Sequence, residues 1–203
     1  MRRLLPTVFI LLSPPAFAAC PTMADIVGGG VYVDFSDGTY VHYRQTGPDV
    51  VGEITYTPDE AGNFFSGRYR GVYLTIDAPL AGDGPDPETL IAFEPAPGAD
   101  DWPAVAPGMS WAGEVVTRDA NGRFINRFEM KVDVIGEDAI HISGCDYDVD
   151  VLRIEEVYET GDGVSQLNYI RALGVGYVAA AGALGEEFEF HYVPRWIGLK
   201  PPR

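Results

Sequence analysis

The sequence predicts an all-β protein, an antiparallel meander of about 10 to 12 strands that forms a curved sheet, an incomplete barrel or a sandwich. Short runs of β-branched and aromatic residues alternate with turns rich in glycine, proline and aspartate along the whole chain. No segment keeps an apolar period of 3.6 residues through three helical turns, so no substantial helix is expected. The spacing of the runs, with no linker or internal repeat, predicts a single domain over residues 19–203.

The N-terminal half is expected to start with a hairpin, because Ser36-Asp37-Gly38 separates two β-branched and aromatic runs. Two proline-rich segments, 77–88 and 95–108, are expected to be loops, because proline cannot donate a hydrogen bond to a neighbouring strand. The longest run would form one strand that bends at Gly71. The strands expected in this half are 31–35, 39–44, 50–57, 64–76 and 90–93.

The C-terminal half has a more regular alternation. Phe124, Phe128 and Met130 alternate with charged residues, which is typical of a strand with one buried face. Gly136-Glu137-Asp138 predicts a turn, and the alternation that begins at Cys145 changes phase at Leu152, where we expect a bulge. The strands expected here are 111–118, 124–135, 139–143, a strand from Cys145 onward, 165–171, 177–181 and 186–193, followed by a tail over 194–203.

Composition excludes some classes of partner. The chain has 203 residues, 14 Lys and Arg against 30 Asp and Glu, and a formal net charge of −16. Nucleic acids and anionic lipid surfaces both require clustered basic residues, so neither is an expected partner. An apolar content of 46% is ordinary for a globular protein and argues against overall disorder.

The first 18 residues have the pattern of a secretory signal peptide. Arg2 and Arg3 precede an apolar stretch over 4–12, and Ala16-Phe17-Ala18 is a small-x-small cleavage motif, so cleavage is expected between Ala18 and Ala19. The apolar stretch is too short for a transmembrane helix, and charges, glycine or proline interrupt every later one. The protein is therefore expected in the periplasm or outside the cell.

The two cysteines allow two interpretations. In an exported protein, Cys20 and Cys145 would form a disulfide, since no other cysteine is present. Alternatively, Phe17-Ala18-Ala19-Cys20 is a lipobox and Cys20 carries a lipid anchor. The disulfide is favoured, because a lipobox usually has an aliphatic residue where Phe17 stands and an acylated Cys20 would leave Cys145 as a lone thiol.

One hairpin prompts a family resemblance. Tyr169 followed by Gly174-Val175-Gly176-Tyr177-Val178 resembles a hairpin of uncharacterised periplasmic half-barrel proteins with a LolA-like fold, similar to the lipoprotein carrier. The resemblance covers about 30 residues. It implies a non-catalytic role in the envelope, with an apolar ligand on the concave face of the sheet.

Two motifs are only formal matches to ligand sites. Residues 174–179 fit Gly-x-Gly-x-x-Ala, but a dinucleotide site requires a strand–helix–strand unit around it, so a tight turn is expected instead. Asp146, Asp148 and Asp150 imitate the start of a calcium loop, but Val151 and Val157 stand where its glycine and glutamate belong. An acidic stripe facing solvent is the favoured interpretation, and a looser Ca²⁺ contact is the alternative.

No catalytic, cofactor-binding or metal-binding residue is predicted. His42, His141 and His191 fall on separate strands, and none has a partner at ligand spacing. Ser110 lacks the Gly-x-Ser-x-Gly context of a nucleophile. Arg68 and Arg70, on one face of a strand, are expected to pair with acidic residues on neighbouring strands.

These observations favour an exported, non-catalytic binding or envelope-assembly protein whose partner is an unidentified protein or an apolar small molecule. Several tyrosines of the N-terminal strands would form either contact surface or core. One alternative is an envelope hydrolase whose site is assembled from distant histidines and carboxylates, and another is an acidic interaction module. Two histidines in one cleft, or one beside a buried carboxylate, would favour the hydrolase. The tyrosines of the N-terminal strands that would form contact surface or core are Tyr32, Tyr40, Tyr43, Tyr69 and Tyr73.

Overall fold

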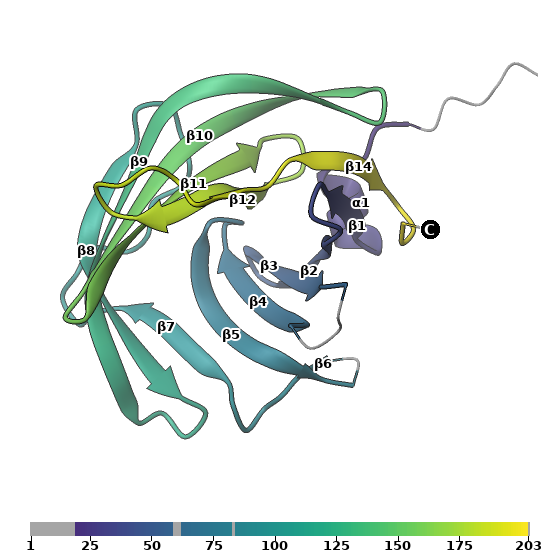
Figure 1. Cartoon of the computed structure of the whole chain (residues 1–203). Coiled ribbons are helices and arrows are strands. Elements are labelled where there is room, and N and C mark those ends of the chain that lie inside the picture. The colour runs from purple at the N-terminus through teal and green to yellow at the C-terminus, as the bar shows by residue number, and fades with distance from the viewer. Residues whose placement is uncertain (1–18, 59–61, 83, 203) are drawn as a thin grey trace, which may run out of the picture.

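The structure is a computed structural model that describes residues 19–58, 62–82 and 84–202 (Figure 1). The expected signal peptide, including Ala18, lies outside the described residues. Ala19 and Cys20, which begin the described chain, are exposed.

The described chain is all-β, as predicted, and its strands form one large antiparallel sheet that is not closed into a barrel. The strand order is β13-β12-β11-β10-β9-β8-β7-β5-β4-β3-β2-β1-β14, and β6 pairs with β5 outside this order. The strands are β1 (Val31–Phe35), β2 (Tyr40–Gly47), β3 (Val50–Tyr56), β4 (Phe64–Tyr69), β5 (Tyr73–Ala81), β6 (Gly84–Pro85), β7 (Ile91–Pro95), β8 (Ser110–Asp119), β9 (Phe124–Ile142), β10 (Cys145–Tyr158), β11 (Gly161–Ile170), β12 (Val175–Ala183), β13 (Phe190–His191) and β14 (Pro194–Gly198).

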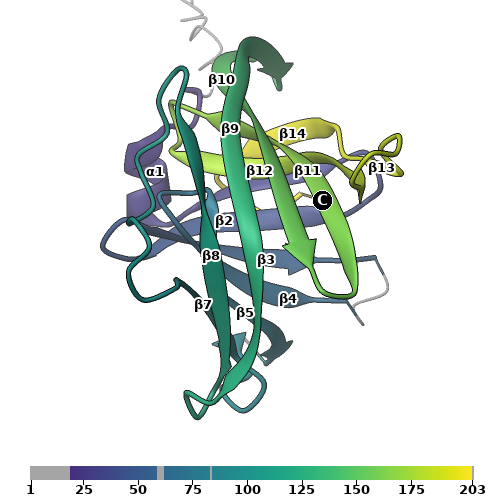
Figure 2. The same ribbon diagram turned by 90° about the vertical axis from the view of Figure 1, so that its left-hand side faces the viewer.

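The sheet curls so that its two ends approach each other. Figure 2 shows β8 and β9 running steeply while β2 to β5 cross behind them, so the two halves of the sheet pack with crossed strands. The end strands β13 and β14 are separated only by Tyr192 and Val193. Tyr192 N–H donates to Ala179 on β12, and the Val193 carbonyl accepts from Ser36 beyond β1. This connection bridges the two ends without pairing them.

The strand expected over 64–76 is in fact two strands. β4 and β5 form a hairpin whose turn contains Arg70 and Gly71, both with positive φ (53° and 70°). Gly71 is required there, because its Cβ would lie 2.1 Å from the Gly174 carbonyl oxygen, and its own carbonyl accepts a hydrogen bond from Gly176. The expected loop over 77–88 is also wrong in part, because β5 continues to Ala81 and β6 pairs with it.

The turn predicted at Gly136-Glu137-Asp138 is wrong as well. These residues continue β9 and pair with Val151, Asp150 and Val149 of β10. Ile135 is the extra residue of a bulge opposite the Val151–Leu152 step, which confirms the bulge expected there. Phe124, expected on the buried face, is 55% exposed, whereas Phe128 and Met130 are buried.

The C-terminal segments also differ from the prediction. The strand expected over 186–193 is reduced to the two residues of β13, and the expected tail contains β14, which pairs with β1. The sequence pattern of β14 is weak, because Pro194 stands at the start of this strand. Proline is tolerated at the first residue of a strand, where no ladder hydrogen bond is lost.

The N-terminus of the described chain is fixed to the sheet. Cys20 and Cys145 form the predicted disulfide, which leads into the helix α1 (Met23–Gly28). Ile26 of α1 is buried, the Tyr147 hydroxyl donates to the Pro21 carbonyl (3.2 Å), and Met23 N–H donates to the Ala172 carbonyl (2.8 Å). With six residues, the helical part of the described chain is too short to span a membrane.

Two hydrophobic clusters fill the curl. One joins β1, β2 and β3 to β10, β11 and β12 and contains Val33, Val149 and Ile170. The other joins the β4–β5 turn and the proline-rich loop to β8, β9 and β10, and contains Tyr73 stacked on Trp102 at 5.3 Å. The halves of the sheet therefore enclose two separate apolar clusters.

Candidate functional site

A cavity of about 410 Å³ lies between the N-terminal strands β1 to β4 and β12. This volume falls within the range of small-molecule sites. Most of its wall is apolar or aromatic, since strand alternation turns Phe35, Val41 and Tyr43 to the same side. Phe35 and Tyr177 contact across the interior, with ring centroids 5.6 Å apart. The remaining apolar wall comes from Phe64, Val178, Ala181 and Tyr192.

An ion pair lies in this apolar wall. Glu53 of β3 and Arg68 of β4 approach to 2.9 Å between Oε2 and Nε, and their side chains are only 10% and 17% exposed. The Arg68 guanidinium is also held by the Val72 carbonyl, which accepts from Nη1 at 3.1 Å. The β4–β5 turn thus fixes the position of the Arg68 guanidinium through this hydrogen bond.

The pair leaves hydrogen-bonding capacity unused. Among the described residues, Glu53 Oε1 has no hydrogen-bond partner, and Arg68 Nε, although close to Glu53, has no acceptor in line with its N–H bond. A buried polar atom without a partner costs about 1–3 kcal/mol of stability. Unsatisfied buried atoms are exceptions in folded proteins, and each calls for an explanation such as a bound water, an ion or a functional role.

Burial has its decisive electrostatic effect on the carboxylate of the pair. It raises the pKa of Glu53, and the neighbouring Asp77 carboxylate adds to this, while Arg68 acts in the opposite direction. Burial also raises the pKa of the Tyr43 hydroxyl well above its usual value, so Tyr43 is a neutral hydrogen-bonding group at neutral pH. The wall therefore combines apolar surface with the Glu53–Arg68 ion pair, the Asp37 carboxylate and neutral hydroxyls.

More polar groups continue from this pair into the interior. Ser66, opposite Glu53 on β4, donates to Asp77 Oδ1 (2.9 Å). Glu156 of β10 accepts from the Tyr158 hydroxyl (3.1 Å), and burial raises its pKa while the Arg68 charge lowers it. Arg68 is thus the cation that Glu53, Asp77 and Glu156 share.

A second, shallower cleft contains two of the three histidines. His141 of β9 and His191 of β13 both line it, beside Asn168, whose amide donates to the Tyr177 hydroxyl (3.0 Å). His141 Nδ1 lies 2.7 Å from Asp146 Oδ1, but these side chains are 67% and 86% exposed, so water competes with both. Two histidines in one cleft meet one of the two criteria that favour the hydrolase, whereas the Asp146 carboxylate beside His141 is not buried. The described residues hold no group of three His, Cys, Asp or Glu suited to a metal ion.

Other residues considered from sequence have structural roles. His42 stacks on Tyr32 at 4.1 Å, and its Nε2 donates to the Gly29 carbonyl (3.1 Å). Burial lowers the pKa of His42. Gly174 lies in a turn with φ of 66°, as expected, and the strand β12 follows it directly. Ser110 donates to Asp133 (2.6 Å) and is exposed.

The stripe of Asp146, Asp148 and Asp150 is not uniformly solvated as expected. The side chain of Asp150 is only 3% exposed and forms an ion pair with Arg171, which also binds Glu137. Arg171 follows β11 directly and folds back over the stripe. Its charge compensates Asp150, so this aspartate has a structural partner.

Arg68 and Arg70 were both expected to pair with acidic residues on neighbouring strands, and this is confirmed for Arg68 only. Arg68 pairs with Glu53 across neighbouring strands, whereas Arg70 lies in the β4–β5 turn with its guanidinium over the Tyr69 ring, 5.0 Å from the centroid. Of the five tyrosines, Tyr43 and Tyr73 are core. Tyr32 and Tyr40 lie on the other face, with ring centroids 6.5 Å apart.

A third hollow, about 530 Å³, lies between α1, the β2–β3 turn and the proline-rich loop. Met23, Val27 and Val105 line it, and Met23 and Val27 are exposed. None of the buried, unpartnered side-chain atoms found among the described residues belongs to its wall. Its chemistry is therefore less specific than that of the Glu53–Arg68 cavity.

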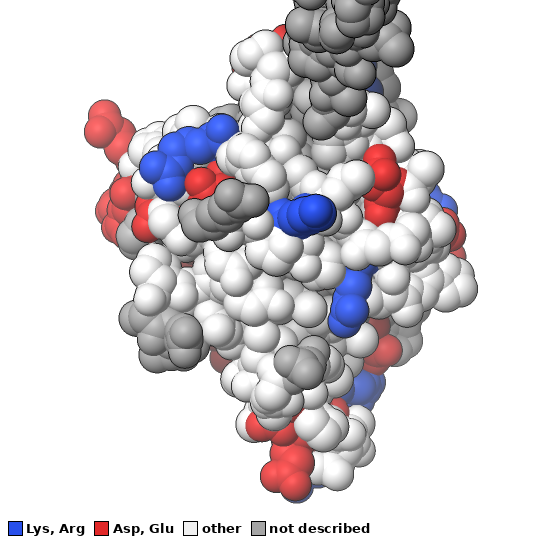
Figure 3. Space-filling view, turned by 90° about the vertical axis from the view of Figure 1, so that its right-hand side faces the viewer, with Lys and Arg blue, Asp and Glu red and all other residues white. Residues whose placement is uncertain are grey.

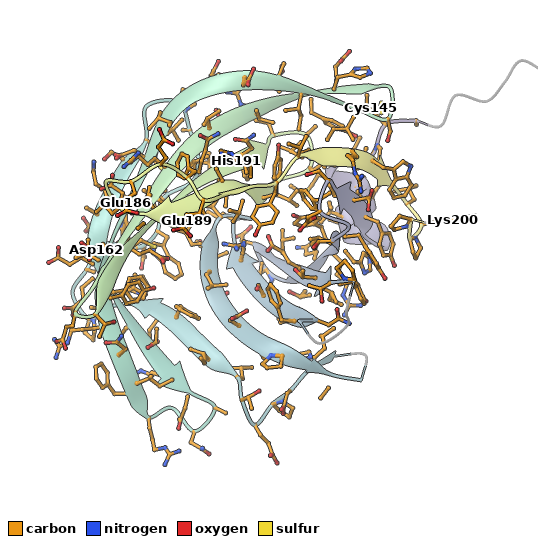
Figure 4. The ribbon with its side chains drawn as sticks, in the orientation of Figure 1. Cys145, Asp162, Glu186, Glu189, His191 and Lys200 are labelled. Atoms are coloured by element: carbon orange, nitrogen blue, oxygen red, sulfur yellow. A yellow bond between two sulfur atoms is a disulfide. The ribbon has the colours of Figure 1, made fainter. Side chains whose placement is uncertain are left out.

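Charge is spread over the surface without a single acidic patch on the face that Figure 3 shows, where uncharged residues dominate. In Figure 4, Asp162, Glu186 and Glu189 lie near the same end of the sheet, around the connection from β12 to β13. Glu189 N–H donates to the Ala181 carbonyl (2.9 Å), so this acidic segment borders the wall of the cavity.

No family model, curated protein or solved structure matches the chain.

The buried ion pair was not predicted as a site from the sequence, although one signal was present. Val51, Glu53 and Thr55 share a strand face with Tyr43 and Val41, which places a carboxylate in an otherwise apolar face. The shared cleft of His141 and His191 was also missed, because it depends on β13 reaching the β12 edge of the sheet.

Proposed function

We propose that the protein is an exported, non-catalytic binding protein that holds an apolar small molecule in the cavity between β1 to β4 and β12. The observation that carries this proposal is an apolar cavity of ligand size with a buried carboxylate oxygen, Glu53 Oε1, that has no partner among the described residues. A core that served stability alone would gain from an apolar pair in place of these charges.

Two features support an exported location for this function. The N-terminal pattern is that of a signal peptide, and the Cys20–Cys145 disulfide belongs to an oxidising compartment. Mass spectrometry of the mature protein is expected to find Ala19 as the first residue and no free thiol. A chain that starts at Cys20 with a diacylglyceryl adduct would overturn the disulfide interpretation in favour of the lipid anchor.

The resemblance of the β11–β12 hairpin to LolA-like half-barrel proteins agrees with the same proposal, because it implies an apolar ligand on a concave face. In this chain the hairpin supplies Tyr177 and Val178 to the cavity wall. The proposal therefore draws on the residues that carry the resemblance.

The test uses the neutral fluorescent probe N-phenyl-1-naphthylamine, whose emission rises in an apolar environment. The wild-type chain is expected to bind it in a saturable manner. Thr55→Trp places a large side chain in the cavity wall and is expected to weaken binding at least about tenfold. Thr160→Trp adds the same side chain at an exposed turn and serves as the matched control.

The proposal fails if the wild type does not bind the probe. It fails equally if both variants bind as the wild type does, since the probe would then occupy another surface. Circular dichroism and thermal unfolding establish that Thr55→Trp is folded before its binding is compared.

A further inference from the structure

The polar groups of the cavity also specify the head of the ligand. We propose, resting on the proposed function, that the ligand is an amphiphile with an uncharged head, a hydroxyl or a primary amide, and that the Glu53–Arg68 pair discriminates against carboxylates.

The two unpartnered atoms of the pair require a ligand head that both donates and accepts hydrogen bonds. Glu53 Oε1 is an acceptor without a donor, and Arg68 Nε is a donor without an aligned acceptor. Glu53 Oε2 lies 2.9 Å from Arg68 Nε, which places Oε1 of the same carboxylate beside the guanidinium, so one small group between them would bond both. A hydroxyl or an amide supplies a donor and an acceptor within one functional group.

The charge balance excludes an anionic head. Among the described residues that line the cavity, Arg68 is the only cation, and Glu53 already neutralises it. Asp37 also lines the cavity, and Glu156 acts on Arg68 from β10, so the surroundings of the arginine are net negative. A carboxylate would lose its hydration without gaining an unpaired cation.

A cationic head is less suitable than a neutral one. An ammonium group could donate to Glu53 Oε1, but it offers no acceptor to Arg68 Nε and would lie beside the guanidinium charge. The hydroxyl or amide satisfies both atoms without adding a charge to the interior.

The apolar part of the ligand has its own place. Phe35, Val41 and Phe64 line the cavity on the N-terminal strands, and Val178 and Tyr192 line it on the opposite side. An alkyl chain between these walls would leave its head at Glu53. A volume of about 410 Å³ accommodates a chain of about ten carbons.

The test is displacement of N-phenyl-1-naphthylamine at pH 7.5 by four compounds of equal chain length: decanol, decanamide, decylamine and decanoate. The wild type is expected to bind decanol and decanamide at least about tenfold more tightly than decanoate, because a carboxylate leaves Glu53 without a donor and adds a like charge. Decylamine is expected between them.

Two variants connect this preference to the pair. Glu53→Gln removes the carboxylate that contacts Arg68 directly and is expected to shift the preference toward decanoate at least about tenfold. If this variant does not fold, Glu53→Gln with Arg68→Met removes both charges and is expected to bind decanol and decanoate with affinities within about threefold of each other.

The possible failures are distinguishable. If the wild type binds the probe but binds decanoate as tightly as decanol, the head-group inference is wrong and the proposed binding function stands. If folded variants keep the wild-type preference, the pair is not the determinant. If the wild type does not bind the probe, the proposed function itself is wrong.

Discussion

The disulfide between Cys20 and Cys145 is expected to provide a large part of the stability of this fold. The bond joins residues 125 positions apart, so the covalent loop contains most of the described domain. In the chain-entropy model, closing a loop of this size lowers the entropy of the unfolded chain enough to stabilise the fold by about 5 kcal/mol at 25 °C. Small domains are stable by only about 5–15 kcal/mol in total.

The perturbation is the double variant Cys20→Ser, Cys145→Ala, in which alanine stands at the buried position. Its free energy of unfolding, measured by urea denaturation followed by tryptophan fluorescence, is expected to fall by about 5 kcal/mol. Wild type kept reduced with dithiothreitol is the control, since it loses the same crosslink without losing side-chain atoms. The two should agree within about 1 kcal/mol, the cost of a small core truncation.

A fall of less than about 1 kcal/mol in both samples would refute the entropic argument, because the unfolded chain would then not be restricted by the bond. A much larger fall in the variant than in reduced wild type would instead locate the effect in packing around Cys145. Two reactive thiols in the untreated wild type would show that the bond does not form.

Three further predictions follow from local geometry. Gly71→Ala is expected to destabilise the fold by at least about 2 kcal/mol more than Gly122→Ala, since both have positive φ but only the Gly71 Cβ would meet backbone, and urea unfolding of each variant checks this; equal losses would contradict the close approach to Gly174. Burial raises the pKa of Glu156, so the folded state binds the proton more readily than the unfolded state. The free energy of unfolding of the wild type should therefore fall relative to that of Glu156→Gln as the pH rises from about 4.5 to 7. A constant difference between the two over that range would show that Glu156 is solvated. His42, whose pKa burial lowers, should titrate below 6.5 by NMR and cost stability as the pH falls through that value, whereas a midpoint above 6.5 would contradict its burial.

The fold class could be predicted because it depends on a local property, the period-two alternation between short turns. The same reasoning placed the bulge at Leu152, where the alternation changes phase in the sequence itself. It failed at residues 64–76, where apolar residues flank the turn and the decisive interaction, Gly71 against Gly174, joins distant segments. It failed at 136–138 because a turn-forming triplet is overridden by continuous pairing with β10.

The candidate site was less predictable than the fold. The disulfide followed from counting cysteines, and the pairing of Arg68 with an acidic neighbour followed from strand geometry. The cavity requires the curl of the sheet to bring Tyr177 of β12 opposite Phe35 of β1, which no local pattern encodes. The unpartnered atoms of Glu53 and Arg68 depend on bond directions, which lie beyond any argument from residue type.

The pairing of the first strand with the last has a consequence for how the chain reaches its native state. Val33 pairs with Ile197, so β1 keeps an open edge until the C-terminal residues are available. Contacts of such long sequence separation slow folding to the millisecond-to-second range. Throughout that time the exposed edge of β1 can pair with other chains, so a defect in β14 would appear first as aggregation.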